Sequence, residues 1–335
     1  MPFDGELAGT TIAPGERKLV ELPVSESAVH QPLTIPVIVD RAKEEGPTLF
    51  VTGAVHGDEV NGVAIVRRIL DRTAGKLLRG TLIAVPIANR FGFEAQERYL
   101  PDRRDLNRSF PGDLQGSLAA RIAARLFRDI VKESEVGVDL HTAAGGNSNL
   151  CHIRGDADVP AVKTLMKAFG TPVLLHGEGP KGSLRRAATD AGVPTIVFEA
   201  GEPRTFQPHV VEVGTAGVWR ILQHLGMVEG QPTKPPLQVL VRETDWVRSD
   251  HGGIFELDVE PGGLVRKGQI LGRITDPLGS HVDDVESPRD GVVIGVCTTP
   301  LVLPGVALVH IGQMQKTFAR AARFVEAGGD LGRLG

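Results

Sequence analysis

The sequence predicts an α/β fold: a mixed, largely parallel sheet covered by helices, with a small C-terminal all-β domain. Apolar strand-like runs alternate with amphipathic stretches from about residue 47 to 227, and this alternation is typical of a parallel sheet between helices. Beyond residue 238 the chain shows only short strand-like runs broken by Gly and Pro. We expect a larger domain over 1–230, a β domain over 238–312 and a tail over 313–335.

The predicted elements of the larger domain begin with two extended runs within residues 15–40, which would form an antiparallel edge. The clearest helix is "SLAARIAARLFRDIVKES", where apolar residues recur every fourth position between arginines. The other predicted strands are residues 48–55, 81–87, 136–140, 172–176 and 194–198.

The predicted linker is "VEGQPTKPPLQ", residues 228–238, which has three prolines and no apolar period. The β domain after it resembles the half-barrels of biotinyl and lipoyl carriers in "VEPGGLVRKGQILGRI" and "VESPRDGVVIG". Such carriers need a lysine at the hairpin tip, but residues 268–290 contain none, so we expect no attached biotin or lipoate. We interpret the domain as a cover for the active site or a contact between subunits. The tail "KTFARAARFVEAG" predicts a short helix.

Composition excludes several classes of function. The net charge of −4 argues against a general nucleic-acid or membrane-surface binder. Two distant cysteines, Cys151 and Cys297, do not indicate a disulfide framework, so the cytoplasm is the expected setting. The N-terminal "MPFDGELAGT" lacks the apolar stretch of a signal peptide, and no run is long enough for a membrane span.

The segment "VTGAVHGDEVNGVAIV" carries the first candidate site, between an apolar strand and a helix that starts near Val60. His56 and Glu59 are three residues apart and would face one way on a helical turn. Imidazole and carboxylate together form half of a zinc ligand set. The pair alone is equally compatible with solvated surface residues, and Asp58 is a candidate cap for the helix.

A third zinc ligand has two candidates. His141 ends the strand "VGVDLH", which places it at the same sheet edge as His56, whereas His152 follows in "NLCHIR". We favour His141 because a strand end is rigidly placed. Asp139, two residues earlier on the same face, could accept the other ring N–H of a ligating histidine.

The polar stretch 89–112 contains five arginines beside this candidate site. Guanidinium groups bind carboxylates through paired hydrogen bonds, so the stretch suggests anion recognition. We interpret Arg103 and Arg104 as solvated surface residues. The others are Arg90, Arg98 and Arg108.

Four motifs, in this order and at these distances, resemble the succinylglutamate desuccinylase/aspartoacylase family of zinc carboxypeptidase-like metallohydrolases. They are "GAVHGDEVNG", "RYLP…RDLNRSFPG", "VDLHT" and "IVFEAGEP", and the resemblance covers roughly residues 15 to 225. Members with the appended β domain include N-acetyl-diaminobutyrate deacetylases. The resemblance implies zinc ligands His56, Glu59 and His141, an oxyanion stabiliser Arg98, substrate-carboxylate residues Asn107 and Arg108, and a general base Glu199.

These implied roles are chemically consistent with the sequence. Glu199 follows the apolar run "PTIVF" and so stands at a strand end, whereas nearby Glu202 fits a surface acid better. Arg108 would hold the free carboxylate of the substrate, with Asp105 orienting its guanidinium. The carboxypeptidase branch also uses a tyrosine near the scissile bond. The single tyrosine here is Tyr99, which directly follows Arg98, and we find no residue to take this role.

We therefore expect a cytoplasmic, zinc-dependent amidohydrolase that removes an acyl group from an N-acyl amino acid and binds one Zn²⁺ per chain. The expected partner is this small-molecule substrate, with no nucleic acid and no membrane, and the chain is a candidate homo-oligomer. Two alternatives stay open. One is a zinc carboxypeptidase acting on small peptides, and the other is a non-catalytic, zinc-containing binding protein.

Overall fold

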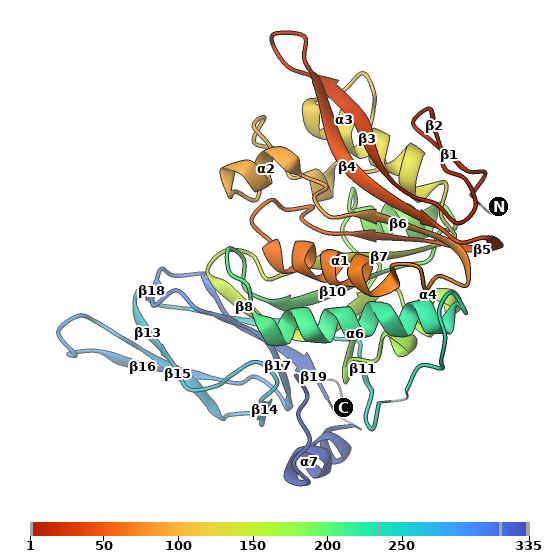
Figure 1. Ribbon diagram of the computed structural model, residues 1–335. Helices are drawn as coiled ribbons and strands as arrows, with labels where there is room; N and C mark the ends of the chain where they lie inside the picture. The colour runs from red at the N-terminus through yellow and green to blue at the C-terminus, as the bar shows by residue number, and fades with distance from the viewer. Residues whose placement is uncertain (1–2, 234, 315–316, 333–335) are drawn as a thin grey trace.

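The computed structural model describes residues 3–233, 235–314 and 317–332, and it confirms the predicted fold class (Figure 1). Residue 234 of the predicted linker and residues 315–316 and 333–335 of the predicted tail lie outside the described part. A large mixed sheet forms the centre of the molecule. Its first strands are β3 (Arg17–Glu26), β4 (Pro32–Arg41), β5 (Glu44–Thr52), β6 (Arg79–Val85), β7 (Val136–His141), β8 (Asn147–Gly155), β9 (Val173–His176), β10 (Thr195–Gly201) and β11 (Val239–Val241).

The centre of this sheet is parallel, and an antiparallel strand joins it on each side. Strands β6, β5, β7 and β10 run parallel to one another in that spatial order. The hairpin β3–β4 joins antiparallel to β6, as expected for the edge formed by residues 15–40. On the other flank β8 lies antiparallel to β10 and parallel to β9. A short separate pair, β1 (Glu6–Leu7) and β2 (Thr10–Thr11), precedes the sheet.

Helices cover both faces of the sheet because each has one apolar side. The core on one face contains buried side chains of α1, α4 and α6, and the core on the other contains those of α3 and α5. Ser117 caps α3 by accepting a hydrogen bond from the Ala120 N–H at 3.3 Å. The helices are α1 (Val60–Thr73), α2 (Arg90–Ala95), α3 (Leu118–Leu126), α4 (Pro160–Phe169), α5 (Leu184–Asp190), α6 (Pro208–His224) and α7 (Phe318–Glu326).

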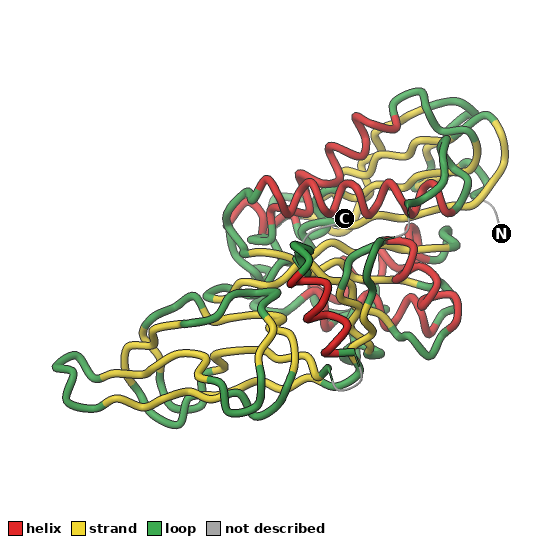
Figure 2. The backbone as a smooth tube through the Cα atoms, turned by 90° about the horizontal axis from the view of Figure 1, so that it is seen from below, coloured by secondary structure: helices red, strands yellow, loops and turns green. Residues whose placement is uncertain are grey.

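The C-terminal strands continue the large sheet. Strand β17 pairs antiparallel with β8, and β19 and β12 follow outward from it. Four further strands form a small sheet in the order β16-β15-β13-β18, and the C-terminal strands extend as an elongated lobe (Figure 2). The bounds are β12 (Thr244–Arg248), β13 (Gly253–Leu257), β14 (Leu264–Val265), β15 (Ile270–Thr275), β16 (Val282–Glu286), β17 (Gly291–Cys297), β18 (Leu301–Val302) and β19 (Ala307–Gln313).

Several boundaries differ from the sequence prediction. Strand β5 ends at Thr52 rather than at residue 55, which leaves residues 53–59 as a loop before α1. The predicted helix over 117–134 is α-helical only to Leu126 and continues as a π-helical turn over Phe127–Val131. Strand β8 was not predicted. The short helix in the tail is present as α7, whereas the domain boundaries stay a prediction. No helix in the described part is long and apolar enough to cross a membrane.

Candidate active site

The carboxyl ends of the central parallel strands meet at one edge of the sheet, where open α/β sheets place their sites. His56 and Glu59 lie in the loop between β5 and α1, and His141 is the last residue of β7. Glu199 lies on β10 directly beside His141 in the parallel register. The strand order therefore brings together side chains from three segments that are far apart in the sequence.

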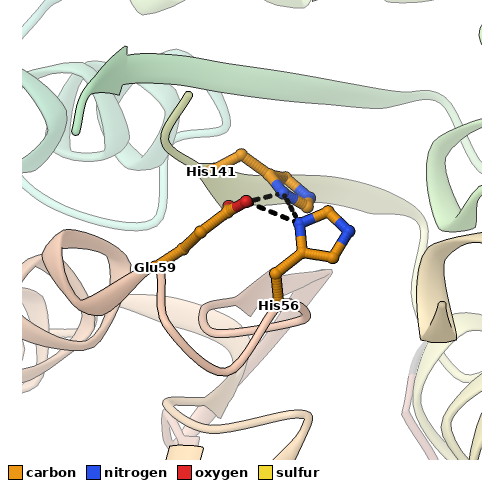
Figure 3. A group of neighbouring side chains, drawn as sticks. All are labelled: His56, Glu59 and His141. Atoms are coloured by element: carbon orange, nitrogen blue, oxygen red, sulfur yellow. Dashed lines mark hydrogen bonds and ion pairs between the residues drawn. The ribbon is translucent and has the colours of Figure 1, made fainter. Parts of the chain in front are cut away.

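His56, Glu59 and His141 point toward one another at this edge (Figure 3). The Nδ1 atom of His56 lies 2.6 Å from one Glu59 oxygen, and the Nδ1 atom of His141 lies 2.9 Å from the other. The two Nδ1 atoms are 3.2 Å apart. Three ligand atoms of suitable type thus converge on one point.

The geometry of this His-Glu-His group fits a metal ion such as zinc. Two nitrogen ligands of a tetrahedral zinc, each about 2.0–2.1 Å from the metal, lie about 3.3 Å apart, close to the separation of the two Nδ1 atoms. The second ring nitrogens are engaged by carboxylates, at 2.7 Å from Asp139 to His141 and 3.2 Å from Asp105 to His56. These contacts fix each ring with Nδ1 facing the group, as metal-binding histidines require. The contact expected from Asp139 is confirmed.

In this group, burial and the neighbouring charges shift the pKa values of Glu59 and His141 in opposite directions. All three side chains are buried, and burial alone would raise the pKa of Glu59. The neighbouring His56 and His141 outweigh burial, so the pKa of Glu59 falls well below its usual range. Burial lowers the pKa of His141, but Asp139 and Glu59 outweigh it and raise the pKa well above its usual value. The carboxylates therefore favour positive charge on His141, and the histidines favour negative charge on Glu59.

The loop that carries His56 is shaped by a close contact with α2. A Cβ atom at Gly57 would lie 1.9 Å from the backbone carbon of Gly92, so only glycine allows the two segments to touch. Ala54, with a φ of 46°, turns the chain out of β5, and its carbonyl accepts a hydrogen bond from the Asn89 N–H at 2.8 Å. The turn and the contact together place His56 above the strand end.

Two alternatives considered for this region do not match the structure. Asp58 does not cap α1, because Glu59 occupies the cap position and no side chain hydrogen-bonds there. His152, the second candidate ligand, is outside the His-Glu-His group. Its Nδ1 bonds to the Leu150 carbonyl at 2.7 Å, and its Nε2 accepts from Arg154 at 3.0 Å.

Arg98 lies beside the His-Glu-His group, but Asp105 has a different partner from the predicted one. The guanidinium of Arg98 donates to Glu59 at 3.2 Å and to Asp105 at 3.1 Å. The side chain of Asp105 therefore binds Arg98 and His56. The prediction that Asp105 orients Arg108 is wrong. Arg108 instead donates to the Asn107 carbonyl at 2.7 Å.

A pocket of about 240 Å³ opens directly above the His-Glu-His group. It contains all seven residues to which the resemblance assigned a metal, catalytic or substrate role. Arg90, Arg103 and Arg104 of the arginine-rich stretch, and also Glu202, do not line it. Its lining includes His56, Glu59, His141, Arg98, Asn107, Arg108 and Glu199, together with Asn149, Arg154, Arg185 and Trp246.

The sequence analysis did not identify the last four of these residues, Asn149, Arg154, Arg185 and Trp246. Arg185, in the first turn of α5, is only 8% exposed, and its Nη1 atom has no hydrogen-bond partner within the described residues. Burial and nearby Arg154 lower the pKa of Arg185 to about 10. A ligand carboxylate would satisfy this buried donor. Trp246 reaches the pocket from β12, with its ring stacked on His310 at 4.5 Å between centroids.

The chain combines a mixed α/β fold with a pocket that contains a candidate three-ligand metal group. Residues 45–225 match the family described as the succinylglutamate desuccinylase/aspartoacylase catalytic domain. The chain belongs to this family, so the resemblance seen in the four motifs is confirmed.

Similar proteins agree with this assignment over most of the chain. The N-alpha-acetyl-L-2,4-diaminobutyric acid deacetylase of Halomonas elongata is 32% identical over 292 residues, which cover 82% of this chain and 84% of that protein. The product-bound structure of the ectoine utilization protein EutE (DoeB) from Ruegeria pomeroyi has a TM-score of 0.80 at 27% identity, covering 89% of this chain and 95% of that chain. The succinylglutamate desuccinylase/aspartoacylase of Rhodobacter sphaeroides has a TM-score of 0.79 at 25% identity, covering 90% and 96%.

Proposed function

We propose that the protein is a zinc-dependent deacylase that hydrolyses the amide bond of an N-acyl amino acid. One zinc ion per chain would be held by His56, Glu59 and His141. The observation that supports this most strongly is a single pocket that contains a three-ligand metal group, a carboxylate and several arginines. The deacetylase from Halomonas elongata, which shares 32% of its aligned residues, supports the same class of substrate.

A zinc ion in this group would supply Lewis-acid activation of a water molecule and of the scissile carbonyl. Glu199 would take a proton from the attacking water and return it to the amine nitrogen as the C–N bond breaks, a transfer typically worth about 10²–10⁴-fold in rate. Its carboxylate lines the same pocket as the His-Glu-His group, and its side chain is 18% exposed. The products are a free carboxylate and a free amine.

Arg98 would stabilise the oxygen that becomes negative as water adds to the carbonyl. Its guanidinium already lies against Glu59, and its side chain is 23% exposed on the pocket side. Asn107 and Arg108 would hold the substrate carboxylate away from the reacting bond. The Asn107 oxygen accepts from the Leu184 N–H at 2.9 Å, so its NH₂ group is the end that remains for substrate.

The structure favours deacylation over the two alternatives. A structural zinc site closes all four positions with protein ligands, but this group has three and opens into a pocket. A carboxypeptidase-like tyrosine is absent from the described lining of the pocket, and Tyr99 is 48% exposed elsewhere. The cytoplasmic setting and the assembly into oligomers stay predictions.

We expect Arg108 to make the enzyme discriminate between a free carboxylate and its amide. The wild-type enzyme should hydrolyse an N-acyl amino acid far better than the corresponding N-acyl amino acid amide. Arg108→Ala should raise KM for the acid by about tenfold or more and lose most of this discrimination, because a charged hydrogen bond typically contributes about 1.5–3 kcal/mol. Arg108→Lys should remain impaired, since an ammonium cannot form the paired contact.

Kinetics with both substrates measure this effect, and Arg104→Ala is the matched control. Arg104 is an exposed arginine in the same stretch and does not line the pocket, so its removal should change neither substrate. Equal cleavage of acid and amide by wild type would show that no carboxylate anchor exists. If Arg108→Ala still discriminates fully between acid and amide, another arginine binds the substrate carboxylate, and Arg185 is the next to test.

A further inference from the structure

The Glu199 carboxylate is oriented by one hydrogen bond. The Asn149 Nδ2 donates to Glu199 Oε2 at 3.1 Å, and within the described residues this is the only hydrogen bond to that side chain. Arg154 is also near, but its Nε is 3.8 Å from Oε1 and donates instead to His152 at 3.0 Å. The direction of the carboxylate therefore depends on Asn149.

The Asn149 side chain in turn contacts β17, a strand of the C-terminal part. It lies on β8, between Gly201 of β10 and Gly295 of β17 in the ladder register. A Cβ atom at Gly295 would lie 2.5 Å from the Asn149 Oδ1, so the amide oxygen occupies space that any other residue would fill. With its oxygen on that side, the amide presents its NH₂ group to Glu199, as an acceptor-only carboxylate requires.

We propose that Asn149 is a positioning residue for the general base and that Gly295 of the C-terminal strands holds it in place. This inference rests on the proposed role of Glu199. It gives the C-terminal part a function in catalysis: strand β17 sets the side-chain amide that aims the base. Oε2 stays bound to Asn149, so Oε1 is the oxygen left to exchange the proton with water and the leaving amine.

Removing the amide should slow the chemical step without weakening substrate binding. In Asn149→Ala we expect kcat to fall by about tenfold or more, since a misplacement of about 1 Å can cost about 10²-fold. KM should stay within about twofold, and zinc content should equal that of wild type. Ser148→Ala is the matched control, because this neighbour points to the opposite face of β8 and does not line the pocket.

Gly295→Ala tests the support independently. The nearest obstructing atom is the end of a side chain, and the nearest backbone atom, the Ser148 carbonyl oxygen, is 3.3 Å away, so the new methyl should swing the amide away from Glu199 and leave the strands paired. We expect the same loss of kcat in the wild-type background and almost none when Asn149 is already alanine, which a double-mutant cycle measures. Gly252→Ala is the control, because its Cβ would meet nothing closer than 3.5 Å.

The possible results separate this inference from the proposed function. Full kcat in Asn149→Ala, or a rise in KM alone, would overturn the positioning role. An equal loss in Ser148→Ala, or a Gly295→Ala loss that persists without Asn149, would overturn it as well. Glu199→Gln is measured alongside. If that variant is inactive while Asn149→Ala is normal, the base stands and only the positioning role fails. If Glu199→Gln keeps its activity, Glu199 is not the general base and that part of the proposed function is wrong.

Discussion

Glu199→Gln should reduce turnover by about a hundredfold or more while the protein stays folded and keeps its zinc. Glutamine has nearly the size of glutamate, and its carbonyl can still accept the hydrogen bond from Asn149. It cannot take a proton from water, however, and so the step that starts hydrolysis loses its base. Steady-state kinetics, with zinc content measured on the same preparation, give the result.

The matched control is Glu202→Gln, three residues further on. Glu202 does not line the pocket, so the same chemical change there should leave turnover almost unaffected. Activity near the wild-type level in Glu199→Gln would rule out Glu199 as the base. A loss of zinc in that variant would instead mean that Glu199 contributes to the metal site.

His141→Ala should remove most of the bound zinc and essentially all activity. The wild-type protein should carry about one zinc per chain, and a catalytic site needs three protein ligands to hold it. Loss of His141 leaves only His56 and Glu59, and it also removes one of two partners of the buried Asp139, which among the described residues keeps only the hydrogen bond from the Thr52 hydroxyl. Elemental analysis and thermal denaturation measure the two effects.

His209→Ala is the control for the loss of a histidine. His209 is exposed on α6 and lies outside the His-Glu-His group, so its removal should leave zinc content unchanged. Retention of zinc by folded His141→Ala would contradict the proposed ligand set. His152 could not then take over without rearrangement, because both of its ring nitrogens are already engaged.

The sequence predicted that the side chains of the candidate site meet, because parallel strands impose a simple rule. His56, His141 and Glu199 each follow an apolar run, and the carboxyl ends of parallel strands meet at one edge. The position of Asp139 followed from the period of two along a strand. The positions of these side chains needed only local pattern and strand direction, and the structure places them at one edge. The zinc ligand set and the role of Glu199 came from the resemblance to the family and stay predictions.

The other residues of the pocket depend on packing that the sequence does not display. Asn149 reaches Glu199 through the antiparallel register of β8, a strand without a clear alternating pattern. Trp246 enters because β12 extends the same large sheet beyond the predicted linker. Asp105 was assigned to the wrong arginine, since proximity in sequence favoured Arg108 whereas the fold of the loop brings it to Arg98.

The most direct test of the proposed function is hydrolysis of a panel of N-acyl amino acids by purified, zinc-loaded protein. We expect at least one member to yield free amine and free acyl carboxylate in equal amounts. This activity should disappear with a chelator and return when zinc is added. Short peptides should be cleaved poorly. Failure to cleave any N-acyl amino acid, turnover that persists without zinc, or release of amino acids from both sides of a peptide bond as the main activity would contradict the proposal.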